Sequence, residues 1–420
     1  MTSEGAAPVA VPTPPAVMPS RARRFAVIAS LYLVSDIGYA FFFGALTTIL
    51  LQRGVPLSQL ALINLLGLLY FGRFLLGPLI DRLGRYRGWL MITQAALVLV
   101  WLALVPLDPG ADLIMVLALT AVALALSAFH DTAMNGLTVR LLPPADRGIG
   151  NGLQAGMACL SIILGTGGAL FLYARLGWGF TVGAVVVIFL IPFLVLLPLR
   201  EPPSEPGPER HRRPFAELIT LVRRPRIGVW MMVILPIFTV GGFLASALLA
   251  PMMIAAHWSM DRIALVQGTL SGPAGLLASL LIGALMNRIG RRGCAILVGC
   301  CWTASIALLL PLSFGGAHPV LDGIAVLSTV LGYSGAALCA YTVSMDLSRP
   351  ASAATDLTAQ VSVLGVLRLV ITPAALALAG VTSFAPLIGV AVLLSGIGTW
   401  VTARWLRRHP ISSTTSKEDT

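Results

Sequence analysis

Apolar stretches long enough to cross a lipid bilayer recur along almost the whole chain of 420 residues. A transmembrane helix needs about 20 consecutive, mostly apolar residues. Twelve such stretches can be marked, at 25–51, 57–80, 89–107, 112–141, 149–173, 178–199, 226–250, 262–286, 294–312, 321–345, 356–380 and 383–405. Only 11% of the residues are charged, whereas a soluble domain carries roughly 25%. We therefore expect an all-α membrane protein with twelve transmembrane helices.

The basic residues are distributed very unevenly between the predicted loops. Of the 28 Arg and Lys residues, 23 lie on the side of the membrane that carries both termini, and three lie in the opposite loops. Lys and Arg are retained in the cytoplasm during insertion, so this bias predicts that both termini are cytoplasmic. The net charge of +11 is thus explained by membrane topology, and we expect no nucleic-acid partner. The two remaining basic residues, Arg73 and Arg368, fall inside predicted spans.

A proline-rich, charged segment separates the sixth and seventh predicted spans. It predicts a cytoplasmic linker at 200–225 between two six-helix bundles, at 25–199 and 226–406. Segment 1–24 is predicted to be a disordered cytoplasmic N-terminal tail, and segment 407–420 a cytoplasmic C-terminal tail.

Motifs for catalysis and for metal binding are missing from the sequence. The five cysteines show no Cys-x-x-Cys spacing, which argues against a zinc site or a disulfide framework. Neither a Walker loop nor a Ser/His/Asp constellation is evident. We therefore expect no enzyme activity, no cofactor and no metal.

A short motif after the second span recurs after the eighth, 206 residues later. The first copy contains Gly77, Asp81, Arg82, Gly84 and Arg85, and the second contains Gly283, Asn287, Arg288, Gly290 and Arg291. Glycine permits a tight turn, and a carboxylate or amide at a helix end can bond a neighbouring helix terminus. We interpret both copies as candidate gating loops.

Two ionisable residues on the first two spans lie at similar depths in the predicted membrane. Asp36 follows the start of its span by about 11 residues, and Arg73 precedes Asp81 by eight, which places both roughly 12–16 Å deep at 1.5 Å per residue. Charges at this depth are costly and usually mark a transport pathway. Asp36 is therefore available as a salt-bridge partner for Arg73.

Polar side chains form helical stripes on the first and fourth spans. Helical spacing places on one face of the first span Tyr32, Asp36, Tyr39 and Phe43. The fourth span carries a comparable stripe of Ser127, Asp131, Asn135 and Thr138. We interpret these faces as the lining of a cavity. Asp36, Asp131 and the neighbouring His130 are candidates for proton coupling, and a His130 bonded to a backbone carbonyl is the alternative.

The second half of the chain offers fewer candidates. The tenth span carries a stripe of Ser334, Tyr341, Ser344 and Ser348, and the eleventh carries Arg368. An Arg guanidinium suits the bidentate binding of carboxylates, although each intramembrane Arg could instead lock two helices together. The candidate substrate contacts are Asp36, Tyr39, Phe43, Arg73, Asp131, Asn135, Tyr341 and Arg368.

The repeated loop motif resembles the signature of the major facilitator superfamily. The first copy matches the pattern G-x-x-x-D-R-x-G-R, while the second departs from it at Asn287. The resemblance covers roughly residues 25–406. It implies two pseudo-symmetric six-helix bundles around a central site, alternating access by rocking, and a gating role for Asp81, Arg82 and Arg288.

Segments 70–82, 128–136, 150–154 and 175–178 resemble the muropeptide-permease-related branch of this superfamily, and segment 345–356 resembles its inner-membrane siderophore importers of the rhizobactin and pyochelin type. This resemblance implies a monomeric secondary transporter in the bacterial inner membrane, surrounded by lipid, whose partner is a carboxylate-bearing small molecule. The leading hypothesis is proton-coupled import of a siderophore, in the form of its ferric complex, from periplasm to cytoplasm. The alternative is import of anhydro-muropeptides. A drug or metabolite exporter is disfavoured, because no Gly-Pro pair precedes Gly165.

Overall fold

The computed structural model describes residues 18–55, 63, 66, 68–83, 85–199, 201, 216–263, 265–266, 270–315 and 318–411. Within these ranges every regular element is helical. The first half of the chain contains α1 (Arg21–Ser35), α2 (Ile37–Ala40), a π-helical segment (Phe41–Leu46), α3 (Thr47–Gln52), α5 (Leu68–Phe71), a 3-10 turn (Gly72–Leu75), α6 (Gly77–Leu83), α7 (Tyr86–Leu104), α8 (Leu113–Leu141), α9 (Arg147–Ile162), a second π-helical segment (Ile163–Gly168) and α10 (Ala169–Leu196).

The second half begins with the short helix α11 (Ala216–Arg223). It continues through α12 (Pro225–Val229), a π-helical segment (Trp230–Ile234), α13 (Leu235–Ala255), α14 (Met260–Ile263), α15 (Ser271–Ala307), α16 (Leu310–Ser313), α17 (Pro319–Leu347), a 3-10 turn (Pro350–Ser352), α18 (Ala353–Val381) and α19 (Phe384–Arg408).

Nine helical runs in the described residues are long and apolar enough to span a membrane. Two of them, Arg147–Leu196 and Ser271–Ser313, bend at a glycine with positive φ, at Gly177 (φ 78°) and Gly290 (φ 72°). Such a φ is strained for other residues and natural for glycine. Each long run therefore consists of two spans that meet at a tight turn, where the sequence predicts separate helices. The predicted span 57–80 lies partly outside the described residues, so the count of twelve stays a prediction.

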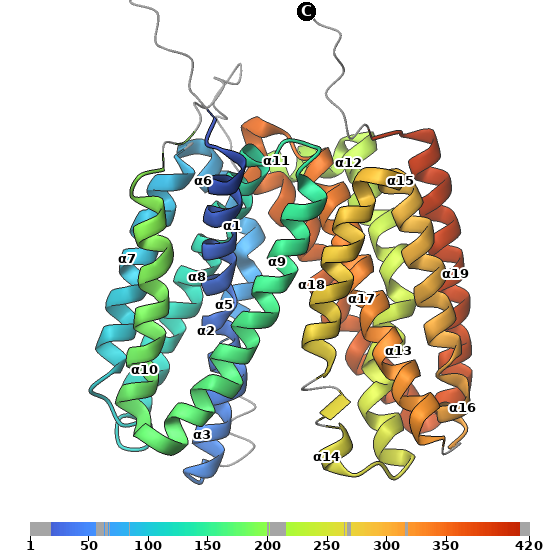
Figure 1. Cartoon of the computed structure of the whole chain (residues 1–420), viewed down its shortest axis with the longest axis horizontal. Helices are drawn as coiled ribbons and strands as arrows, with labels where there is room; N and C mark the ends of the chain where they lie inside the picture. Colours follow the sequence, from blue (N-terminus) through green and yellow to red (C-terminus); the bar gives the residue numbers. More distant parts are fainter. Residues whose placement is uncertain are drawn as a thin grey trace, which may run out of the picture.

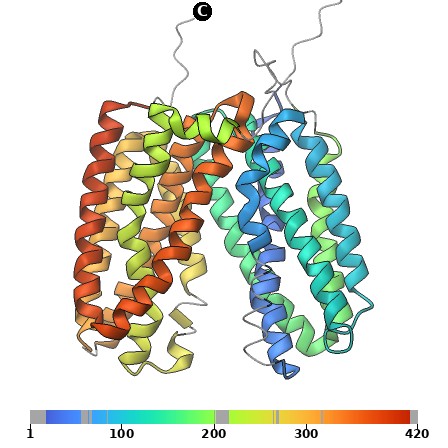
Figure 2. The same cartoon turned by 180° about the vertical axis from the view of Figure 1, so that it is seen from behind.

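The helices form two bundles that stand side by side (Figure 1, Figure 2). The start of α1 and the end of α19 lie at the same end of the molecule (Figure 1), which we call the termini side. One buried apolar cluster belongs to the first bundle and another to the second. A third cluster joins the bundles on the termini side, since it combines Ile28 and Leu137 with Met345 and Leu357. Burial of apolar surface thus holds the two halves together at that end.

Large apolar side chains cover the outer faces of the bundles. On α19, Leu393, Ile397 and Trp400 are 67%, 54% and 64% exposed and share one helical face. An apolar stripe of this kind is stable against lipid and unfavourable against water. The fold is therefore that of an all-α membrane protein.

Candidate functional site

A cavity of about 810 Å³ lies between the two bundles. The first bundle contributes side chains from α1, α2, α8, α9 and the segment around Arg73, and the second contributes side chains from α13, α17 and α18. Seven of the eight predicted substrate contacts line it: Asp36, Tyr39, Arg73, Asp131, Asn135, Tyr341 and Arg368. Their roles in binding remain proposals, but the structure brings them around one space.

Phe43 and His130 are not part of this lining. The helix is interrupted at Asp36, and Phe43 lies in the π-helical segment Phe41–Leu46, whose wider turn rotates later residues away from the face expected for a regular helix. The Phe43 ring instead packs on Tyr39, with ring centroids 4.5 Å apart. His130 is 1% exposed, and its side chain is buried away from this lining.

Arg73 forms its ion pair with Asp131 rather than with Asp36. The Asp131 carboxylate also accepts hydrogen bonds from Ser35 and from the Tyr70 hydroxyl, the latter at 3.0 Å. The Arg73 guanidinium donates to the Tyr70 hydroxyl at 2.9 Å and lies over its ring. The expectation that Asp36 would neutralise Arg73 is wrong, because depth along the span says nothing about which neighbouring helix an Arg faces.

Asp36 and Arg368 are the charged groups of the cavity that the described residues leave without an ion pair or hydrogen bond. Asp36 belongs to the first bundle and Arg368 to the second. The Arg368 guanidinium lies over the Tyr333 ring, 6.0 Å from its centroid. An unpaired acid and an unpaired base that face one cavity from opposite bundles are suited to a ligand carrying both charges.

The cavity is closed on the termini side by contacts between the bundles. Asp81 accepts hydrogen bonds from the backbone N–H groups of Ala354 and Thr355, at 3.2 and 2.8 Å. These groups belong to the first turn of α18, where backbone donors lack helical partners and the helix dipole favours a negative charge. Gly77 allows the approach, because a Cβ atom there would lie 2.6 Å from Thr355 Cα.

A second closure lies where α9 meets α15 and α17. Asp346 accepts from Arg147 of the first bundle and from Arg291 of the second, both at 2.8 Å. The Arg291 side chain is almost fully buried and also donates to the Pro144 carbonyl at 2.6 Å. Gly148 and Gly283 face each other so closely that a Cβ atom on either would lie 2.5–2.7 Å from the other's carbonyl oxygen.

The remaining predicted gating residues behave differently. Arg82, Arg85, Asn287 and Arg288 are exposed, and none forms an ion pair within the described ranges. Gly290 makes the turn between two spans, and Gly84 lies outside the described residues. The two copies of the motif therefore contact the opposite bundle through different positions. Asp81 makes this contact in the first copy, and Gly283 and Arg291 make it in the second.

Sequence reasoning missed two residues that the structure makes prominent. Tyr333 lines the cavity together with Ala337 and Tyr341, a spacing of four that was readable from the sequence. The predicted stripe instead began at Ser334, one position away, and its Ser344 is buried against the Trp230 indole N–H at 2.9 Å. Asp346 was recognisable only as an acid near a helix end, because both of its partners are remote in sequence.

Two helical bundles around a polar cavity, closed at one end by contacts between the bundles, define a membrane transporter of the alternating-access type. The Major Facilitator Superfamily model matches residues 28–370. The chain belongs to this superfamily, and it is a transporter rather than an enzyme.

The chain is similar to known transport proteins. It is 26% identical over 314 residues to the anhydromuropeptide permease of Escherichia coli K12, covering 72% of this chain and 63% of that protein. The match thus spans less than two thirds of the relative's length. One similar solved structure is the human organic anion transporter MFSD10, with a TM-score of 0.69 and 16% identity over 91% of this chain and 100% of that chain. Another is the transporter FucP in the outward conformation, with a TM-score of 0.69 and 14% identity over 93% of this chain and 99% of that chain. These two establish similarity of fold.

Proposed function

We propose that this protein imports an anhydro-muropeptide or a closely related carboxylate-bearing peptide conjugate from periplasm to cytoplasm. Transport would follow alternating access, in the bacterial inner membrane, by a monomer of bundles 25–199 and 226–406 with cytoplasmic termini. The observation that carries the proposal is the cavity with unpaired Asp36 on one bundle and unpaired Arg368 on the other. Peptide stems carry amino and carboxylate groups that such a pair can bind simultaneously.

The similarity to the Escherichia coli anhydromuropeptide permease supports this substrate class. Siderophore import, the leading hypothesis from the sequence, is not favoured by any relative named above. The cavity is closed on the termini side by Asp81 and Asp346, so the state described is the one that would receive substrate from the periplasm. We therefore place the muropeptide first and keep the siderophore as an outcome of the test.

The proposal is tested by uptake in cells that lack their own permeases for both substrates. Cells producing this protein receive either a radiolabelled anhydro-muropeptide or a labelled ferric siderophore in the periplasm. We expect accumulation of the muropeptide in the cytoplasm and background levels of iron. Accumulation of iron alone would overturn the proposal in favour of the siderophore, and accumulation of neither would reject both.

Proton coupling is proposed to pass through Asp36. Asp131 is held by Arg73 and His130 lies outside the cavity lining, so Asp36 is the acid of the cavity that is free to change its protonation. Asp36→Asn is expected to lower proton-driven accumulation about tenfold or more, a loss typical of a missing proton-transfer group, while equilibrium exchange across the membrane continues. The matched control is Asp112→Asn, an exposed acid at the start of α8. Unchanged accumulation in Asp36→Asn would exclude this role.

A further inference from the structure

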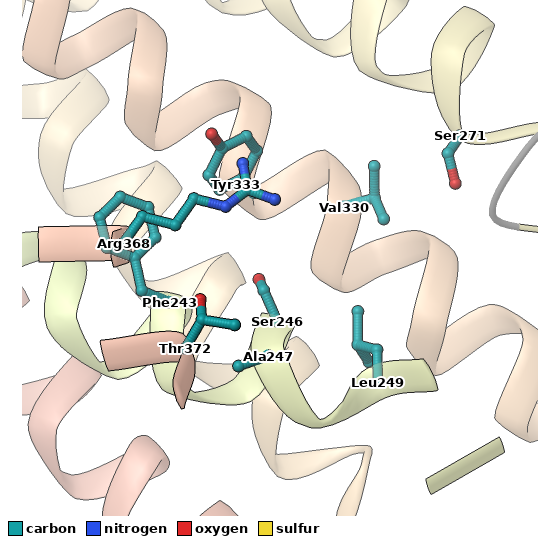
Figure 3. Close-up of a pocket in the computed structure, with 9 residues that line it drawn as sticks. All are labelled: Phe243, Ser246, Ala247, Leu249, Ser271, Val330, Tyr333, Arg368 and Thr372. Atoms are coloured by element: carbon teal, nitrogen blue, oxygen red, sulfur yellow. The ribbon is translucent and has the colours of Figure 1, made fainter. Parts of the chain in front are cut away.

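A second pocket of about 370 Å³ opens from the central cavity into the second bundle. The two spaces share Phe243, Tyr333, Arg368 and Thr372. The remaining lining residues come from α13, α17 and the start of α15 (Figure 3). We call this space the side pocket. It lies wholly within one bundle, whereas the central cavity lies between the two.

The polar groups of the side pocket are available to a ligand. The Arg368 guanidinium extends past the Tyr333 ring into the space (Figure 3). Within the described residues the hydroxyls of Ser246, Thr372 and Tyr333 have no hydrogen-bond partner, whereas the Ser271 hydroxyl donates to the Val266 carbonyl at 2.7 Å. Polar groups that line a pocket and are not used in the protein's own hydrogen bonds are available to orient a ligand.

The charge of the side pocket is one-sided. Among the described residues, its lining contains the cationic Arg368 and no acidic residue. Val330 and Leu249 form an apolar wall beyond the Arg368 guanidinium, and the Phe243 ring lies beside the Arg368 side chain (Figure 3). This combination suits a carboxylate attached to a short aliphatic group, because the guanidinium and the hydroxyls donate to the oxygens while the wall packs against carbon.

We propose that the side pocket binds the carboxylate-terminated end of the substrate, while the rest of the substrate occupies the central cavity. The identity of that end as a peptide terminus rests on the proposed function. The preference for a carboxylate does not, since it follows from Arg368 and the hydroxyls alone. The site would therefore discriminate between a peptide acid and the corresponding amide.

The charge preference is tested without any substrate, by cysteine labelling of purified protein. Ser246→Cys is introduced after replacement of the five native cysteines, and its reaction rates with a sulfonate-bearing and an ammonium-bearing methanethiosulfonate are compared. We expect the anionic reagent to be favoured about tenfold through attraction to Arg368, and Arg368→Gln to abolish the preference. Gln154→Cys, on the central-cavity wall of the first bundle, is the control whose ratio Arg368→Gln should change less. A preference that survives Arg368→Gln would overturn the proposal.

The second measurement compares inhibition of uptake by a muropeptide with a free terminal carboxylate and by its terminal amide. We expect the acid to inhibit about tenfold better in the native protein, a difference typical of one charge-assisted contact, and equally well in Arg368→Gln. Equal inhibition in the native protein would contradict the side-pocket site. Inhibition by neither compound, with the labelling preference intact, would support the carboxylate site and reject the muropeptide as substrate.

Discussion

Asp131→Asn is expected to destabilise the protein by on the order of 3 kcal/mol and to abolish transport. The variant leaves the Arg73 guanidinium, 17% exposed as a side chain, without its anionic partner inside the membrane. It also weakens the acceptor for Ser35 and Tyr70. Because a partly buried, uncompensated charge costs far more than a missing pair, the effect exceeds that of removing both charges.

The measurement is thermal unfolding of the purified protein together with uptake in vesicles. The double variant Arg73→Gln/Asp131→Asn should regain most of the stability while transport stays lost. Asp108→Asn is the matched control, because it breaks the exposed Arg53–Asp108 pair at 3.2 Å and exposed pairs contribute little. If Asp131→Asn unfolds at the same temperature as Asp108→Asn, the ion pair does not hold the first bundle as described.

Gly148→Ala is expected to disfavour the closed state of the termini side and thereby to lower uptake about tenfold or more. A tenfold loss corresponds to a free-energy change of about 1.4 kcal/mol against the closed state. The new Cβ atom would lie 2.7 Å from the Gly283 carbonyl oxygen. That neighbour is backbone and cannot rotate away. Since α9 and α15 belong to different bundles, separating the bundles relieves the contact.

Opening is measured by the labelling rate of a cysteine at Thr342, which is fully buried and bonded to Asn151 across the interface at 3.0 Å. Gly283→Ala should reproduce the effect of Gly148→Ala, since its Cβ atom would lie 2.5 Å from the Gly148 carbonyl oxygen. Gly183→Ala is the control, because a Cβ atom there meets no heavy atom within 4 Å. Equal labelling rates in Gly148→Ala and Gly183→Ala would show that the contact between Gly148 and Gly283 is not needed to close the termini side.

The helical faces predicted from spacing were accurate where the helix stays regular. Tyr32, Asp36 and Tyr39 line the cavity as one face of the first span. Phe43 leaves that face because a π-helical segment intervenes, and nothing in its apolar sequence distinguishes that segment from an α-helix. Local periodicity therefore predicts a face only as far as the hydrogen-bonding pattern is constant.

The sequence by itself determined the membrane class, the superfamily and the charged residues of the cavity lining, since length, hydropathy, helical spacing and the loop motif are local properties of the chain. Only the tertiary structure decided the partners of the charges: Asp131 for Arg73, Asp346 for Arg147 and Arg291, and, within the described part of the chain, no acid for Arg368. The bilayer sets the depth of each span but not its rotation or its neighbours. Packing between helices decides those, and through them it decides which polar groups are left free for substrate.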